Sequence, residues 1–275
     1  MIPPAFEHLR ADSTEAAVAA LVAHGDEAKL LAGGHSLLPL MKLRLASPAV
    51  LVDIGELREL SYVRDAGDHV AIGAMTRHRE LERSELLAAQ VPIVAHAAGH
   101  VGDPQVRNRG TIGGSVAHGD GASDLPAVVL ALGATMVAVG PSGERTIAAE
   151  EFFRGFLETA LAPDEMLTEI RLPKVPRSPW SFQKFNRRAM DWAIVGCAVV
   201  RGSGIGLVNM GVTPLRASAT ERALAEGSTD ADAAALADVG TSPGSDIHGS
   251  EEYRRHLARL LVGRALAASV APAGP

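Results

Sequence analysis

Two short glycine-rich segments are the places where this sequence could hold a ligand with its backbone. Ala32 to Ser36 reads AGGHS and follows an apolar run, and Thr111 to Ser115 reads TIGGS. Paired glycines allow a tight turn and a close approach of bare backbone, and N–H groups that converge can bind an anion such as phosphate. A single segment of this kind is more typical of an ordinary turn between a strand and a helix. Two of them in one chain could hold the two sides of a diphosphate.

Asp124 is the acidic residue best placed to add a further contact, because it follows closely after the second segment. Its carboxylate could accept a hydrogen bond from a sugar hydroxyl. It could equally cap the helix that is expected to follow it. The residues alone leave both roles open.

The remaining candidates indicate structural roles. His96 and His100 are four residues apart, but Ala97 stands where a zincin has Glu, and no third ligand is apparent. Cys197 lies within the apolar run AIVGCAVV and is expected to be a buried, inert thiol. Residues 202–206 imitate a dinucleotide fingerprint, but a strand-like run follows, so a hairpin turn is expected. We predict no metal ligand and no catalytic acid, base or nucleophile.

Composition and charge narrow the class of protein. The 275 residues are 47% hydrophobic but only 4% aromatic, so we expect a core of aliphatic side chains. A formal net charge of −6 argues against a nucleic-acid partner, which would need a basic face. No apolar run approaches the roughly 20 residues that span a bilayer, and no signal peptide is recognisable, so we expect a cytoplasmic protein. The one cysteine cannot hold an iron–sulfur cluster, so any such cluster must lie on another chain.

The first segment is expected to lie within a β-α-β-like unit. A capping box at Asp12 predicts the start of a helix that ends at Gly25. Apolar runs at 29–32 and 49–54 predict strands before and after the first segment. By contrast, residues 103–124, which contain the second segment, are polar and glycine-rich and show neither helix nor strand periodicity.

The rest of the chain predicts two further lobes. A proline-rich stretch at 173–179 marks the boundary between them. Before it we expect a helix and two strands, at 124–132, 134–139 and 165–172. After it we expect an antiparallel sheet and two helices, with strands at 182–185, 193–200 and 204–212. The domains are accordingly predicted at 1–57, 58–175 and 176–275.

The last helix is predicted to begin with Ser250 as its N-cap. Its expected buried stripe consists of Tyr253, Leu257, Leu260 and Leu261. Three arginines of the same helix, Arg254, Arg255 and Arg259, are expected on its surface.

Over essentially its whole length the chain resembles the FAD-binding medium subunits of molybdenum hydroxylases, the xanthine dehydrogenase family. The resemblance rests on AGGHSLLPLMKLRLASP and TIGGSVAHGDGASDLPA, and it extends to MIPPAFEHLR, VGDPQVRNRG and KFNRRAMDWAIVG. The two glycine motifs at this separation are quite specific to the family. Ser115 departs from the Asn of many members, but its hydroxyl can still donate to a phosphate. Within the family, the match is nearest to the branch that serves aerobic carbon monoxide dehydrogenases.

The resemblance implies an α+β fold, in which a vanillyl-alcohol-oxidase (PCMH-type) FAD-binding fold of two α/β lobes precedes a C-terminal domain of an antiparallel sheet with helices. It implies that backbone N–H groups of both segments hold the FAD diphosphate and that Asp124 binds the ribityl or ribose region. Leu167 would pack near the ring system. Lys184 would lie near the isoalloxazine and favour the anionic reduced flavin, although it could also be an ordinary surface lysine. The residues implied to bind the cofactor are Ala32, Gly33, Gly34, His35, Ser36, Leu37, Thr111, Gly113, Gly114, Ser115, Asp124, Leu167 and Lys184.

The resemblance also implies partners. A small subunit with two [2Fe–2S] clusters would pass electrons to the FAD, and a large subunit with the molybdenum cofactor would oxidise the substrate. The expected assembly is a dimer of heterotrimers, without a membrane-spanning segment and with peripheral membrane attachment left open. A quinone or another acceptor would take the electrons. Carbon monoxide is the first substrate expected, while aldehydes, purines and N-heterocycles stay open.

Two other functions compete with this one. A stand-alone flavoenzyme of the same fold would need acid and base groups that converge over the flavin, and the last ~100 residues show no such cluster. A scaffold subunit that has lost its flavin would not need two intact glycine motifs. Bound flavin colour and substrate oxidation by the isolated chain would separate the three.

Overall fold

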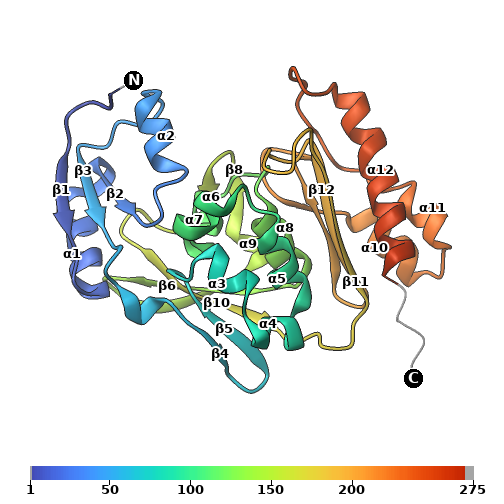
Figure 1. Cartoon of the computed structure of the whole chain (residues 1–275), viewed down its shortest axis with the longest axis horizontal. Coiled ribbons are helices and arrows are strands. Elements are labelled where there is room, and N and C mark those ends of the chain that lie inside the picture. The colour runs from blue at the N-terminus through green and yellow to red at the C-terminus, as the bar shows by residue number, and fades with distance from the viewer. Residues whose placement is uncertain (1, 270–275) are drawn as a thin grey trace.

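The N-terminal lobe is built on a small parallel sheet that delivers the first glycine segment. A computed structural model describes residues 2–269 (Figure 1). Its first sheet has the strand order β1-β3-β2, with both pairs parallel. The elements are β1 (Glu7–Arg10), α1 (Thr14–His24), η1 (Gly25–Glu27), β2 (Ala28–Leu31), α2 (Leu37–Lys42) and β3 (Val50–Asp53). The first segment connects β2 to α2, as the sequence predicted.

The middle lobe is an antiparallel five-stranded sheet covered by short helices. Its strand order is β4-β5-β10-β6-β7. The sheet strands are β4 (Val63–Asp65), β5 (His69–Gly73), β6 (Thr135–Gly140), β7 (Gly143–Ala148) and β10 (Met166–Pro173). The helices are η2 (Arg58–Leu60), α3 (His78–Glu82), α4 (Glu85–Gln90), α5 (Pro92–Gly99), α6 (Pro104–Arg109), α7 (Ile112–His118), α8 (Asp124–Ala131) and α9 (Ala149–Phe152), and β8 (Phe153–Gly155) pairs with β9 (Glu158–Thr159).

The C-terminal lobe places a four-stranded antiparallel sheet between two helical layers. The strands, in spatial order, are β11 (Trp180–Phe185), β12 (Val195–Val200), β13 (Gly204–Val208) and β14 (Leu215–Arg216). The helix α12 (Glu251–Ala268) covers one face and α8 of the middle lobe covers the other, with α10 (Ser218–Ala225) and α11 (Asp230–Ala234) beside α12 (Figure 1). A Cβ on Gly206 would collide with the carbonyl oxygen of Ala127, so α8 packs directly against bare backbone of β13. The middle and C-terminal lobes are therefore closely packed.

Several sequence predictions are confirmed in this part of the chain. Residues 202–206 belong to the hairpin of β12 and β13, with the turn at 201–203 and residues 204–206 at the start of β13. Cys197 is buried in β12, and this burial raises the pKa of its thiol to about 12. Ser250 caps α12 by accepting a hydrogen bond from the Tyr253 N–H. The domain limits after residues 57 and 175 stay predictions.

Several predictions of local structure are wrong. Three helices, α10, α11 and α12, follow the C-terminal sheet where two were expected, because α11 is too short to show a helical pattern. Ser13, not Asp12, caps α1, because its extended backbone lets its Oγ accept from the Ala16 N–H. Residues 103–124 contain α6 and α7, which are too short to show periodicity. On α12, Tyr253 and Leu260 are 41% and 39% exposed, whereas Arg254 is only 2% exposed.

The burial of Arg254 has a clear physical cause. Its guanidinium donates to the Ile194 carbonyl and to the Asp246 carboxylate, and these bonds offset the cost of removing it from water. Helical periodicity cannot foresee partners that lie on other segments. In residues 2–269, no helix has the length and apolar character that crossing a bilayer would demand.

Candidate cofactor-binding site

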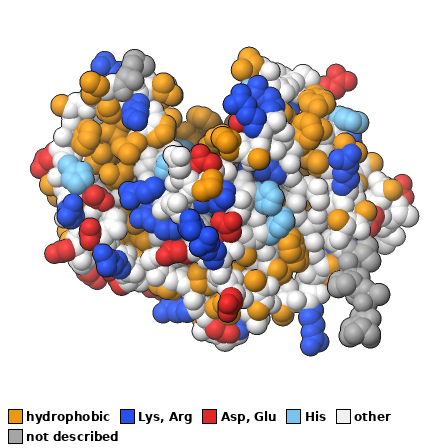
Figure 2. Space-filling model, viewed as in Figure 1, with side chains coloured by type: hydrophobic (Ala, Val, Ile, Leu, Met, Phe, Trp, Pro, Cys, Tyr) orange, Lys and Arg blue, Asp and Glu red, His pale blue; other side chains and the backbone are white. Residues whose placement is uncertain are grey.

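A cleft of about 450 Å³ lies where the three lobes meet. On the face drawn in Figure 2, the surface is hollowed between the N-terminal lobe and the rest of the molecule. All thirteen residues that the resemblance implied line this cleft, although they come from all three lobes. They are Ala32, Gly33, Gly34, His35, Ser36, Leu37, Thr111, Gly113, Gly114, Ser115, Asp124, Leu167 and Lys184. Their individual contacts to a cofactor stay predictions.

The first segment presents unpaired backbone donors. Within residues 2–269, the N–H groups of Gly33, Gly34, His35 and Ser36 form no hydrogen bond to backbone or side chain. Gly34 has a φ of +77°, in the left-handed region that glycine adopts without strain. Four consecutive N–H groups without partners at the wall of a cleft are suited to an anionic ligand.

The second segment is different, because its N–H groups from Ile112 to Ser115 are already occupied. Ile112 donates to the Thr76 carbonyl, Gly113 to the Ala74 carbonyl, and Gly114 and Ser115 to the side-chain and backbone oxygens of Thr111. The Ser115 side chain is half-buried at the cleft wall. This segment therefore offers a hydroxyl more readily than backbone donors, in contrast to the predicted use of its N–H groups.

The two segments touch each other. A Cβ on Gly33 would collide with the Arg109 carbonyl oxygen and lie 2.8 Å from the Cα of Gly110, immediately before Thr111. A Cβ on Gly114 would lie 3.9 Å from the Cβ of Ala32. The segments are thus close enough to contact one ligand, and the absence of a side chain at Gly33 is what permits this.

Asp124 and Lys184 form a buried ion pair at the cleft. Lys184 Nζ lies 2.7 Å from Asp124 Oδ2 and also donates to the His100 carbonyl at 2.9 Å. The two side chains are only 8% and 5% exposed. Burial raises the pKa of Asp124, and the Lys184 ammonium opposes this rise. Asp124 Oδ1 is buried without a partner, so it can accept a hydrogen bond from a ligand.

Sequence reasoning missed several cleft residues. Met190, Asp191 and Trp192, on the loop between β11 and β12, line the cleft from the C-terminal lobe. A tryptophan within a polar hairpin loop was the available signal. Asp191 Oδ2 lies 3.7 Å from Arg187 Nε, which is too long for a hydrogen bond.

His78 was also missed, and no sequence signal marks it. Its ring lies against Gly110, because a Cβ there would be 2.7 Å from the ring carbon Cδ2. Burial, with smaller contributions from nearby His35, Arg107 and Arg77, lowers the pKa of His78 to about 4. The imidazole is therefore neutral near pH 7, and its Nδ1 is buried without a partner.

These features fit FAD. Free N–H groups suit a diphosphate, and an unpartnered buried carboxylate oxygen suits a sugar-like hydroxyl. The apolar side chains of Met166, Leu167 and Trp192 at the cleft wall suit a flat ring system. Among the described residues 2–269, no cluster of three or more His, Cys, Asp or Glu could hold a metal ion.

Comparison with known proteins gives the family. Residues 4–175 match the FAD binding domain in molybdopterin dehydrogenase, and residues 180–269 match the CO dehydrogenase flavoprotein C-terminal domain. The carbon monoxide dehydrogenase medium chain of Hydrogenophaga pseudoflava is 44% identical, over 98% of each chain. A subunit of the 6-hydroxypseudooxynicotine dehydrogenase complex of Paenarthrobacter nicotinovorans is 39% identical, over 100% of this chain and 98% of the relative.

The structures agree with the sequences. A chain of the carbon monoxide dehydrogenase from Hydrogenophaga pseudoflava, solved without the Mo-pyranopterin moiety, superposes with a TM-score of 0.93 at 43% identity, covering 98% of each chain. The chain therefore belongs to the FAD-binding medium subunits of the molybdenum hydroxylases, in the xanthine dehydrogenase family, and is an oxidoreductase subunit.

Proposed function

We propose that the first glycine segment donates most of the hydrogen bonds that hold the FAD diphosphate. The main support is that the consecutive N–H groups from Gly33 to Ser36 have no partners. Gly33 also lies against Gly110, immediately before the second segment. In this arrangement the first segment donates from its backbone. The second segment closes the other side with the Ser115 hydroxyl and with the bare backbone of Gly114.

The buried pair orients the rest of the cofactor. Asp124 Oδ1 accepts a hydrogen bond from a ribityl hydroxyl, and the pair's other oxygen stays with Lys184. Leu167 packs against the ring system from β10. Because Asp124 balances the Lys184 charge at 2.7 Å, the pair favours a reduced anionic ring less than a free lysine would. Bound FAD supplies the electron-accepting chemistry that these side chains do not have.

The partners follow from the relatives. We assign the chain to a complex with a small [2Fe–2S] subunit and a large molybdenum subunit, assembled as a dimer of heterotrimers in the cytoplasm. Electrons enter from the nearest cluster and leave to a quinone or a similar acceptor. Carbon monoxide is the proposed substrate of the complex, because the medium chain from Hydrogenophaga pseudoflava is 44% identical. An N-heterocycle is the second candidate, because the 6-hydroxypseudooxynicotine dehydrogenase subunit is 39% identical.

Purification of the whole complex tests these assignments. We expect a yellow medium chain whose heat-released cofactor co-elutes with FAD at one per chain, and partners that contain iron and molybdenum. Reduction of a quinone analogue with carbon monoxide, but not with a nicotine-like heterocycle, would support the first substrate.

Substrate oxidation by the isolated chain would favour a stand-alone flavoenzyme, and a folded but colourless chain would indicate a scaffold. Cell fractionation and mass measurement test the location and the stoichiometry.

A further inference from the structure

The loop between β11 and β12, residues 186–194, brings the C-terminal lobe to the cleft. Met190, Asp191 and Trp192 lie on it and line the cleft. Met190 and Trp192 are 56% and 57% exposed, so burial of their side chains does little to fix the loop. Its position must depend on polar bonds to its backbone.

Two side chains from distant elements bind the end of this loop. Arg254 Nη1 donates to the Ile194 carbonyl at 2.5 Å. Asn209 Nδ2 donates to the Ala193 carbonyl at 2.8 Å and to the Ile194 carbonyl at 3.2 Å. The end of the loop is therefore held from α12 on one side and from the end of β13 on the other.

Asn209 also connects the loop to the segment that leads to Asp124. Its backbone N–H donates to the Gly121 carbonyl at 2.7 Å. Its φ of +61° lies in the left-handed region, which is unusual for a residue other than glycine. Asparagine tolerates this conformation better than most residues. The strained backbone and the two side-chain bonds together point to a role for the amide.

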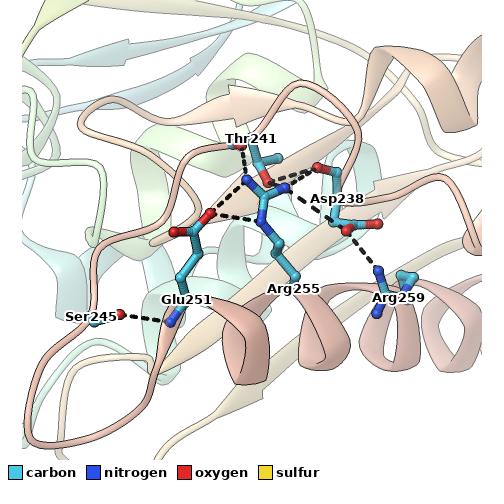
Figure 3. A network of polar contacts seen from close by, with 6 residues as sticks. All are labelled: Asp238, Thr241, Ser245, Glu251, Arg255 and Arg259. Atoms are coloured by element: carbon cyan, nitrogen blue, oxygen red, sulfur yellow. Dashed lines mark hydrogen bonds and ion pairs between the residues drawn. The ribbon is translucent and has the colours of Figure 1, made fainter.

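Arg254 is fixed from the side away from the cleft. Its Nη2 donates to Asp246 at 2.7 Å, and Asp246 lies on the loop that precedes α12. Figure 3 shows how that loop is attached to the helix: Arg255 donates to the Thr241 carbonyl and to Glu251, and Arg259 donates to Asp238. A chain of polar contacts thus runs from α12 to the wall of the cleft.

We propose that Arg254 and Asn209 are positioning residues that set the flavin environment by holding the loop at 186–194, with Asp246 acting through Arg254. This inference rests on the proposed FAD site. Neither residue lines the cleft, so an effect of Arg254 on the flavin must pass through the loop. Asn209 also reaches Gly121 through its backbone N–H, but Asn209→Gly keeps that bond and removes only the amide that holds the loop.

The opposite end of β12 provides a matched control. There Arg201 pairs with Asp230 at 2.9 Å and donates to the Leu266 carbonyl of α12. Asp230 is 41% exposed and Asp246 49%, and each pairs with an arginine of the same lobe. Only the Asp246 pair leads to the cleft loop. Asp246 Oδ1 also accepts from the His248 and Gly249 N–H groups, and Asp246→Asn keeps an oxygen that can accept these bonds.

The test uses the full chain loaded with FAD, and the variants Arg254→Met, Arg254→Lys, Asn209→Gly, Asp246→Asn and the control Asp230→Asn. Asn209→Gly removes the amide while relieving the backbone strain, so it stays informative if Arg254→Met does not fold. The readouts are the visible absorption spectrum and midpoint potential of the flavin, and Trp192 fluorescence. Of the two tryptophans in the chain, Trp180 is replaced by Phe so that Trp192 alone reports.

We expect Arg254→Met and Asn209→Gly to shift the flavin spectrum and potential and to raise the FAD dissociation constant about tenfold. Arg254→Lys should restore part of the wild-type behaviour, and Asp246→Asn should show a smaller shift. Asp230→Asn should leave all three readouts at wild-type values. Unchanged readouts in Asn209→Gly, or equal shifts in Asp230→Asn, would overturn the inference. Failure of the parent chain to bind FAD would instead refute the proposed function.

Discussion

The two glycine segments look alike in sequence but differ in what their backbones do. Gly33 to Ser36 leave four N–H groups without partners, whereas Ile112 to Ser115 have all of theirs bonded within the fold. The glycines differ in the same way. Gly33 faces the other segment, whereas a Cβ on Gly113 would collide with the side chain of Ala74. In the function we propose, the first segment receives the ligand with its backbone, and the second mainly brings its neighbour and its own hydroxyl into place.

The largest expected contrast comes from adding one methyl group to each segment. Gly33→Ala should weaken FAD binding by about tenfold to a hundredfold, because the new Cβ forces two stretches of backbone apart. Gly113→Ala should instead lower the free energy of unfolding by about 1–3 kcal/mol, because its Cβ enters the packed core around Ala74. Fluorescence titration with FAD and denaturant unfolding measure the two effects.

A helical glycine remote from the cleft controls for the added methyl group. A Cβ on Gly263 in α12 would lie 3.5 Å from the Cβ of Ala234, which is ordinary contact, so Gly263→Ala should leave FAD affinity unchanged. If Gly33→Ala also binds FAD like the parent chain, the close approach of the two segments is not needed for binding.

We expect acid to lower the free energy of unfolding through His78, whose ring packs against Gly110 just before the second segment. Its pKa is lowered to about 4 in the fold and returns to about 6.5 in the unfolded chain, so only the unfolded chain binds a proton between these values. The neutral imidazole therefore contributes full stability above pH 6.5, and up to about 3 kcal/mol is lost as the pH falls toward 4. Unfolding curves across this range should show the loss.

His78→Gln provides the comparison for this pH dependence. The variant should be less stable near neutral pH but should lose little further stability between pH 6.5 and 4. An equal acid-induced loss in both proteins would assign the effect to other groups.

The smallest contrast concerns the two hydroxyl residues at the helix starts. Thr111 accepts from the Gly114 N–H, so Thr111→Val should cost about 1 kcal/mol of folding free energy. Ser36 makes no capping bond at the start of α2, so Ser36→Ala should leave stability unchanged and weaken FAD binding by a few-fold. The reverse result, with stability lost at Ser36 and not at Thr111, would remove the distinction between the segments.

How far the sequence predicts this site depends on whether a feature is local. The glycine pairs and Asp124 could be identified from the motifs and Lys184 from the family resemblance, and all of them line the cleft. The sequence could not reveal that the N–H groups from Ile112 to Ser115 are already bonded, because their acceptors include the carbonyls of Ala74 and Thr76, almost forty residues away in sequence. The Asp124–Lys184 pair, 60 residues apart, needs two lobes to meet before it exists.

The same limit explains the errors of the fold prediction. The helices α6 and α7 have six and seven residues, which is too short for a periodic pattern of buried side chains. Arg254 looked like a surface residue because its partners, the Ile194 carbonyl and Asp246, belong to other segments. Buried strands and the start of α12 at Ser250 follow the sequence pattern, whereas two members of the expected stripe of α12, Tyr253 and Leu260, are exposed.

Amide hydrogen exchange of the full chain with and without FAD measures the difference between the segments most directly. The N–H groups from Gly33 to Ser36 should exchange quickly without FAD and become protected when FAD binds. Those from Ile112 to Ser115 should already be protected without it and change little. Unchanged exchange at Gly33 to Ser36 on binding FAD, or new protection confined to Ile112 to Ser115, would contradict binding of the FAD diphosphate by the backbone of the first segment.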